Sequence, residues 1–520
     1  MSRTKNSEAG FTMVATLIGM MIVTALALAA VTAVRGDIPL TSRDLASKKA
    51  YEAAKAGIED YASHVYADSL YWTKCTEVPT PNAVNPSGST TKRRSVPGEP
   101  NTAYAIELLP ASTQTTYSQC STASPGPSML ETSGPTAGSF RIRSTGFAGG
   151  VSVPIVASFK RPSFLDYVYF TQLETLDPAA YGYANPSTQL TGAYSQCELT
   201  YEEGRQNANI PGTNSKCSTI SFITGDAIEG PVHTNDKFSI CGNPRFGRKI
   251  QDMIEMGAKK PGWYTCSGTT SNPTFAGTPV TPAQILVPPE TNSKLASIAL
   301  PQFTYTGQVR ICLSGTTMTV GNGETCTGLY SGAIPSNGVI YVKNGACSTA
   351  YTPFGTVYAE NGSPCGNAYV KGTYTGQLTI AAENDVVING SLCRTSCGTA
   401  SGEALLGLIA NNFVRIYHPC SNDNNSNRSL ENPVVDAAIL AIKHSFIVDN
   451  YDCGSPLGDL TVEGAIAQKF RGPVGTSNNG NPSSGYLKEY DYDDRLRYLE
   501  PPSFIEPTGT SWVIGRETLG

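Results

Sequence analysis

The stretch FTMVATLIGMMIVTALALAAVTAV, from Phe11 to Val34, decides how the rest of this 520-residue sequence is interpreted. It carries no charged residue. At a rise of about 1.5 Å per residue such a helix is about 36 Å long, which exceeds a hydrocarbon core of about 30 Å. A cleaved secretory signal has an apolar core of only about 7 to 15 residues. We therefore predict a transmembrane helix over residues 11–34.

The flanking residues predict the orientation of this helix. Arg3 and Lys5 precede it, and the positive-inside rule keeps that end in the cytoplasm. The chain also has 14 cysteines, which is many for a reducing cytosol and typical of an oxidising environment. We predict a single pass through the cytoplasmic membrane with the amino terminus inside. The remaining chain would lie at the cell surface or in an extracellular filament.

The short basic leader, residues 1–10, ends in Gly10 and is followed by Phe11-Thr12-Met13 and the apolar run. This arrangement resembles the class III (prepilin-type) signal of type IV pilins and type II secretion pseudopilins. The resemblance implies that a prepilin peptidase cuts between Gly10 and Phe11 and methylates the new amino terminus. It also implies that other pilins or pseudopilins bind through the helix. An ordinary signal anchor that never enters a filament is the alternative.

The sequence departs from the major-pilin pattern at the fifth mature position, where the family has a glutamate and this chain has Ala15. In a packed filament that carboxylate neutralises the positive charge of the terminal amine of a neighbouring subunit, because an unpaired buried charge is costly. Minor pilins at the tip and K-type pseudopilins resemble this chain in lacking it. The resemblance therefore implies a role at the tip or in priming.

Residues 35–162 predict a small pilin-like head. Gly36 and Pro39 are expected to interrupt the first helix, and a second helix is expected over about 41–67, where apolar residues recur at steps of three and four. The alternating runs suit antiparallel strands that cover one face of this helix, and they span residues 103–108, 139–143 and 151–159. Cys75 and Cys120 are a candidate disulfide of this head.

The rest of the chain predicts a β-rich body. Charged residues make up only 15%, and 51 Gly and 35 Pro indicate frequent turns. Residues 382–388, 410–416 and 442–448 align without gaps, as expected for successive coils of a parallel β-helix. A two-sheet sandwich is the alternative. We predict a connector over 163–221, a β-solenoid body over 222–475 and a docking segment over 476–520.

The predicted fold class is thus an α+β pilin-like part, with a long transmembrane helix and an antiparallel sheet, followed by a mainly β domain, a right-handed parallel β-helix. Phrases such as Gly230–Asp236, Leu405–Ala410 and Pro501–Phe504 resemble pilin-like proteins that carry a region of this kind after the head.

The remaining cysteines suit disulfides that brace the body. Cys393 and Cys397 are too far apart for a Cys-x-x-Cys motif and have no matching second pair, which argues against a dithiol or zinc site. Further cysteines are separated by short loops and are candidates for disulfides of the same kind. The candidate disulfide cysteines of the body are Cys312, Cys326, Cys347, Cys365, Cys393 and Cys397.

Motifs for catalysis or metal binding are weak. His233 with Asn235 and Asp236 is interpreted as a turn, because no other histidine stands at ligand spacing. The run from Asp423 to Ser429 lacks the glycine of a calcium loop, having Arg428 instead. Neither a Gly-x-Ser-x-Gly elbow nor a phosphate-binding loop is present. We predict no catalytic residue, no cofactor and no metal.

The predicted function is a non-enzymatic minor pilin or pseudopilin at or near the tip of a pilus-like filament. It would display a disulfide-braced domain for assembly priming or adhesion, with a surface or glycan ligand as candidate partner. The net charge of -5 disfavours nucleic acid. The alternatives are a membrane-anchored adhesin outside any filament and a β-helix enzyme acting on polysaccharide.

Overall fold

The computed structural model describes residues 9–67, 71, 93–109, 139–160, 162–180, 186–323, 325–347, 363–395, 397, 402–419, 429–478, 481–497, 499–508 and 513–519. Side chains of the first helix are described for residues 13–28 and 42–67. The chain divides into two compact units. The head unit comprises Met1–Thr132, Gly138–Arg161 and Ser511–Gly520, and the body unit comprises Ser133–Ala137 and Pro162–Thr510.

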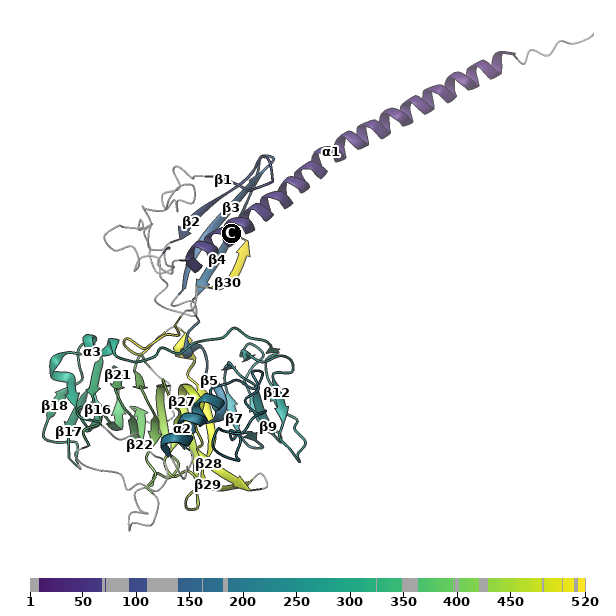
Figure 1. Cartoon of the computed structure of the whole chain (residues 1–520). Helices are drawn as coiled ribbons and strands as arrows, with labels where there is room; N and C mark the ends of the chain where they lie inside the picture. Colours follow the sequence, from purple (N-terminus) through teal and green to yellow (C-terminus); the bar gives the residue numbers. More distant parts are fainter. Residues whose placement is uncertain are drawn as a thin grey trace, which may run out of the picture. The chain divides into compact units, whose positions relative to one another are not determined.

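The head unit packs helix α1 (Ala9–Ala67) on a five-stranded antiparallel sheet (Figure 1). The helix residues that recur at steps of three and four, Ile58, Tyr61 and Val65 among them, are buried against Phe140 and Phe159 of the sheet. The sheet consists of β1 (Arg94–Ser95), β2 (Thr102–Leu109), β3 (Ser139–Ala148), β4 (Val151–Lys160) and β30 (Val513–Leu519).

A glycine allows the helix to approach this sheet closely. A Cβ added at Gly146 of β3 would lie 1.9 Å from the carbonyl oxygen of Ala50 in α1. Because that contact is with backbone, any side chain here would push the helix off the sheet.

The carboxyl-terminal strand of the head unit comes from the far end of the sequence. β30 pairs antiparallel with β4, so that Leu519 lies opposite Ile155. Of the predicted docking segment over 476–520, the residues up to Thr510 belong to the body unit and Ser511–Gly520 belong to the head unit.

The body unit is a stack of mostly parallel strands in two runs. The first run follows helix α2 (Pro186–Cys197) and comprises β6 (Phe222–Ile223), β7 (Ala227–Glu229), β8 (Val232–Thr234), β9 (Phe238–Cys241), β10 (Arg245–Phe246), β11 (Ile254–Met256), β12 (Trp263–Thr265), β13 (Thr274–Phe275) and β14 (Pro279–Val280).

The second run follows the short helix α3 (Lys294–Ile298). It comprises β15 (Thr304–Thr306), β16 (Val309–Gly315), β17 (Thr317–Gly321), β18 (Tyr330–Ala333), β19 (Val339–Lys343), β20 (Ala368–Tyr374), β21 (Gln377–Ala382), β22 (Val386–Arg394), β23 (Leu405–Ala410), β24 (Val414–Ile416), β25 (Val434–Ala441), β26 (Phe446–Val448) and β27 (Pro456–Arg471).

Within the second run, each coil stacks in parallel on the next. β19 pairs with β21, β21 with β23, β23 with β25 and β25 with β27. On another face Val386 lies beside Val414, and Val414 beside Phe446. Residues at the same position of successive coils thus form buried apolar ladders.

The two runs meet at a seam, which we define as β5 (Tyr169–Leu176), β7, β8, β27 and β29 (Asn481–Tyr492). β5 pairs in parallel with β27 on one side and β8 on the other. β29 likewise joins β27 to β7, and it forms an antiparallel hairpin with β28 (Gly475–Asn478). In Figure 1, β5 lies between β27 and β7. The last strand of the second run therefore stacks on the first run through strands from both ends of the body sequence.

The predicted fold class, an α+β part with a long transmembrane helix followed by a mainly β domain, was wrong. The chain is mainly β, with a 22-stranded, a 5-stranded and a 3-stranded sheet in its described part. Among the described residues, no helix combines the length and the apolar character that crossing a membrane requires. Side chains are described only for residues 13–28 of the predicted transmembrane helix over residues 11–34.

The predicted interruption at Gly36 and Pro39 was also wrong, because α1 is one element from Ala9 to Ala67. A proline removes a single backbone hydrogen bond from a helix. The preceding and following turns can continue around it with a bend.

Candidate functional site

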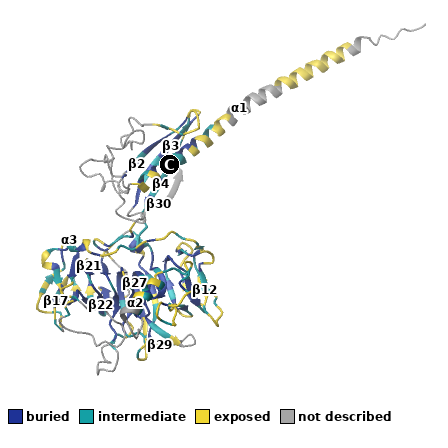
Figure 2. Ribbon diagram, in the orientation of Figure 1, coloured by how far each residue is buried: buried dark blue, intermediate teal, exposed yellow. Residues whose placement is uncertain are grey.

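The amino-terminal part of α1 exposes large apolar side chains. They occur at consecutive positions and so cover the whole circumference of the helix, in contrast to the one-sided burial further along (Figure 2). Soluble proteins rarely expose an apolar surface of this extent unless another molecule covers it. The exposed large residues are Met13, Val14, Leu17, Ile18, Met20, Met21, Ile22, Val23, Leu26 and Leu28.

The polar groups of this stretch are satisfied within the helix. The hydroxyl of Thr16 donates to the carbonyl of Met13 at 3.0 Å, and that of Thr24 donates to Met20 at 2.8 Å. These bonds leave an outer surface that is suited to apolar contact with other helices. Ala15 is exposed in this stretch. Gly10 and Phe11 belong to α1, but their side-chain surroundings lie outside the description.

Disulfides brace the body unit. Three join cysteines that we named as candidates: Cys312–Cys326, Cys347–Cys365 and Cys393–Cys397. Two further disulfides, Cys197–Cys217 and Cys241–Cys266, were missed, although their separations of 20 and 25 residues also mark short loops. Cys75 and Cys120 lie outside the described residues.

His233 lies in strand β8 and not in the predicted turn. Its Nδ1 lies 2.9 Å from Glu255 and its Nε2 lies 3.0 Å from Asn235 Oδ1. Tyr167 donates to the same Glu255 carboxylate at 2.7 Å. Burial opposes ionisation of Glu255, but the hydrogen bonds from His233 and Tyr167 outweigh it and lower its pKa.

This histidine cluster fastens another segment of the chain. The side-chain oxygen of Asn235 accepts from the backbone nitrogen of Leu286 at 3.0 Å, and its amide donates to the Leu286 carbonyl. In the part of the chain that the structure describes, no group of three His, Cys, Asp or Glu side chains is placed to hold a metal ion.

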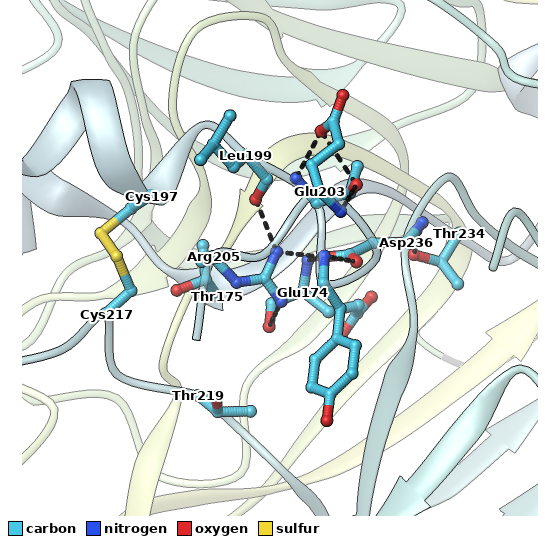
Figure 3. Close-up of polar contacts among 12 residues, drawn as sticks. Glu174, Thr175, Cys197, Leu199, Glu203, Arg205, Cys217, Thr219, Thr234 and Asp236 are labelled. Atoms are coloured by element: carbon cyan, nitrogen blue, oxygen red, sulfur yellow. Dashed lines mark hydrogen bonds and ion pairs between the residues drawn. A yellow bond between two sulfur atoms is a disulfide. The ribbon is translucent and has the colours of Figure 1, made fainter. Parts of the chain in front are cut away.

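A buried ionic network lies at the seam, and Figure 3 shows its part around Arg205, Asp236 and Glu174. Arg205 pairs with Asp236, and the two side chains are 3% and 0% exposed. Asp236 also accepts from the backbone nitrogen of Glu174 at 2.9 Å. Arg471 of β27 pairs with the Glu174 carboxylate at 3.1 Å. The network thus joins four charged residues from distant parts of the sequence, and no motif revealed it.

The Glu174 carboxylate is fully buried in this network. Burial raises its pKa, while Arg471 and the hydroxyl of Thr171 act in the opposite direction. The loop that carries Arg205 is closed by the Cys197–Cys217 disulfide, and Arg205 donates to the Leu199 carbonyl within it at 2.9 Å. Figure 3 shows the disulfide beside this arginine. The arrangement fastens a loop onto the seam.

A second buried cluster surrounds Arg394 at the end of β22. Its guanidinium lies 2.6 Å from Asp493 and 2.5 Å from Glu463. Asp436 accepts from the Arg394 backbone nitrogen at 3.0 Å. Burial raises the pKa of Asp436 to about 6, although the bonds and charge of Arg394 oppose that rise. This group therefore titrates well above the range of an exposed aspartate.

Pockets open on the described part of the body unit. One of about 670 Å³ lies beside α2, and there His444 Nδ1 lies 3.1 Å from the buried carboxylate of Asp177. Another, of about 850 Å³, lies where residues 218–226 meet residues 473–477 and 482–488. We call this second pocket the seam pocket.

The sequence matches no model of a known protein family, and no curated protein matches it. Among solved structures, it is similar to a crystal structure of the competence-associated pilin ComZ from Thermus thermophilus, at 12% identity and a TM-score of 0.30. The match covers 91% of this chain and 98% of that chain. The TM-score is too low for this likeness to bear on fold or function.

Proposed function

We propose that this chain is a low-copy, pilin-like subunit that joins a surface filament through α1 and displays its body unit outside the cell. The observation that carries the proposal is the apolar surface of residues 13–28 of α1. In both units the other apolar side chains mostly pack into cores, whereas these residues are exposed around the entire helix. Packing between the helices of neighbouring subunits would cover that surface.

Processing of the leader would release this helix for assembly. The proposed partners are a prepilin peptidase, which would cut between Gly10 and Phe11 and methylate the new terminus, and other pilins or pseudopilins. Ala15 supplies no carboxylate to offset the terminal amine of a neighbour, which favours a subunit at the tip or one that primes assembly.

The body unit supports display of this subunit in few copies. It extends from Pro162 to Thr510, which is most of the chain, and repeating it at every filament position would crowd the surface. The buried charges of its seam are paired, and disulfides close its loops. We propose that it works without catalysis, in assembly priming or adhesion.

Mass spectrometry of filaments sheared from the native host tests this proposal. The chain is expected in the filament fraction with N-methyl-Phe11 as its first residue. Gly10→Val should block cleavage and lower the amount in filaments at least tenfold. Gly323→Val is the matched control, because it lies in the body unit, away from the proposed contact surface of α1, and a Cβ at Gly323 meets no atom within 4 Å. It should be processed and incorporated as the wild type is.

Two results would overturn the proposal. One is a chain that keeps its intact leader in the functional protein at the cell surface. The other is Gly10→Val protein that is uncut and yet present in filaments at the wild-type level.

A further inference from the structure

The seam pocket is built from both runs of the body unit. One wall comes from residues 218–226 together with Cys241 and Cys266, and the other from residues 473–477 and 482–488. The disulfide between Cys241 and Cys266 ties the first wall, and the β28–β29 hairpin forms part of the second. Its volume of about 850 Å³ lies within the range of about 300 to 1,000 Å³ that is typical of sites for small ligands.

The charge of the pocket restricts the chemistry of its ligand. Among its described lining residues only Asp226 and Lys488 are charged, and these two pair with each other at 3.0 Å. Burial lowers the pKa of Lys488, and the charge of Asp226 opposes that shift. Since the pair is internally neutralised, the pocket offers no free charge to a phosphate, a carboxylate or a cation.

Hydroxyl groups dominate the polar part of the lining. Thr224 Oγ1 accepts from the backbone nitrogen of Asn243 at 3.0 Å, and a hydroxyl with one such bond can still donate its proton. Thr219 and Ser477 are exposed at the pocket. The hydroxyl-bearing lining residues are Ser218, Thr219, Ser221, Thr224, Thr269, Thr476 and Ser477, with the two tyrosines Tyr451 and Tyr486.

Apolar side chains complete the lining between these hydroxyls. They include Ile220, Ile223, Pro473 and Leu487. A ligand that fits must therefore present many hydroxyls, each able to donate and accept, together with patches of C–H groups, and it must carry no charge. Sugars combine these properties in one molecule.

We propose that the seam pocket binds an uncharged saccharide, as a short oligosaccharide or as the exposed end of a longer glycan. Hydroxyls of the pocket exchange hydrogen bonds with sugar hydroxyls, and the apolar lining contacts the faces of the sugar rings. This activity goes beyond filament assembly and does not depend on α1, so the two proposals can fail separately.

Isothermal titration calorimetry of the full chain tests the proposal. The protein is held in a detergent without a sugar head group, so that the exposed part of α1 is covered and no detergent competes for the pocket. The probes are four neutral trisaccharides, built from glucose in α-1,4 linkage, glucose in β-1,4 linkage, mannose and xylose, with trigalacturonate and inorganic phosphate for comparison. At least one neutral trisaccharide should bind with a dissociation constant below 1 mM. Trigalacturonate and phosphate should bind at least tenfold more weakly.

A variant that blocks the pocket tests whether the saccharide binds there. Thr219 is exposed, so Thr219→Trp fills the opening without disturbing a core, and it should weaken saccharide binding at least tenfold. Thr316→Trp is the matched control at an exposed turn of the second run that does not line the pocket, and its affinity should stay within twofold of wild type. Circular dichroism should be the same for both variants and the wild type.

Each contrary result overturns the proposal. These results are no binding of any neutral probe, charged probes binding as tightly as neutral ones, and binding that Thr219→Trp leaves unchanged. If Thr219→Trp loses its native circular dichroism, Ser477→Trp replaces it with the same expected loss, since Ser477 is also exposed at the pocket.

Discussion

The second run of the body unit and the seam use the same parallel strand pairing but are held together in different ways. In the second run, apolar residues such as Val386, Val414 and Phe446 stack on one another. At the seam, Glu174 and Arg471 form a buried ion pair across 297 positions of sequence. Apolar ladders tolerate small changes of shape, whereas a buried charge loses its compensation when its partner is removed. The ion pairs of the seam should therefore be more sensitive to conservative substitution than the apolar ladders of the second run are.

Asp236→Asn should have the largest effect. It keeps the shape of the side chain but leaves the buried guanidinium of Arg205 without its counter-charge. Removing one partner of a buried ion pair costs about 3 to 5 kcal/mol. Urea unfolding followed by near-ultraviolet circular dichroism should show this loss in the transition of the body unit.

Asp494→Asn is the matched control for that substitution. The Asp494 side chain is 50% exposed in its ion pair with Arg248, and such exposed pairs contribute about 0 to 1 kcal/mol. Equal losses in the two variants would contradict the distinction between the buried and the exposed pairs.

Asp436→Asn should change how stability depends on pH. The folded pKa of Asp436 is raised to about 6 from 3.8, so the folded state binds its proton more tightly than the unfolded state. The wild type should therefore lose stability as the pH rises from about 4 through 6, by about 3 kcal/mol from this group alone.

The Asp436→Asn protein has no carboxyl group that titrates at this position. Its free energy of unfolding, compared with that of the wild type, should therefore be higher at pH 7 than at pH 4. Urea unfolding of both proteins at pH 4, 5, 6 and 7 measures the difference. The nearby charges of Arg394, Glu463 and Asp493 are present in both proteins, so their contributions largely cancel. A difference that does not change with pH would refute the assignment.

Apart from the control Asp494→Asn, Ile388→Val should have the smallest effect, because it removes one methylene from an apolar ladder. Ile388 is fully buried beside Ile416, and this change typically costs about 0.5 to 1.5 kcal/mol. The same urea experiment measures it. A loss as large as that of Asp236→Asn would mean that the ladders are as sensitive as the seam, and the contrast between the two regions would fail.

Local patterns predicted the elements whose partners lie close in sequence. The second halves of the repeats, residues 386–388, 414–416 and 446–448, pair in the aligned register, because stacked coils place similar side chains above one another. At the start of the third repeat the pairing differs by one residue, since Ala410 pairs with Ala441. Short disulfide loops such as Cys312–Cys326 were also visible. In α1, spacing by three and four marked the face on which Ile58 packs.

Patterns of this kind could not predict the seam or the pocket beside it. Glu174, Arg205, Asp236 and Arg471 stand in unrelated stretches, and nothing in their neighbours indicates that they meet. The pocket likewise depends on two segments, around Thr219 and Ser477, that only the stacking order brings together.

The amino-acid sequence by itself determined the apolar character of residues 11–34, the amphipathic face of the helix near Ile58 and the coil repeats of the body. Each follows from side chains within a few turns or one coil of one another. Only the tertiary structure decided that β5 and β29 join the two runs, that β30 pairs with β4, and that Asp226 neutralises Lys488 beside the pocket. The physical reason is that pairing between distant strands and buried charges depends on how the whole chain packs, which local periodicity does not encode.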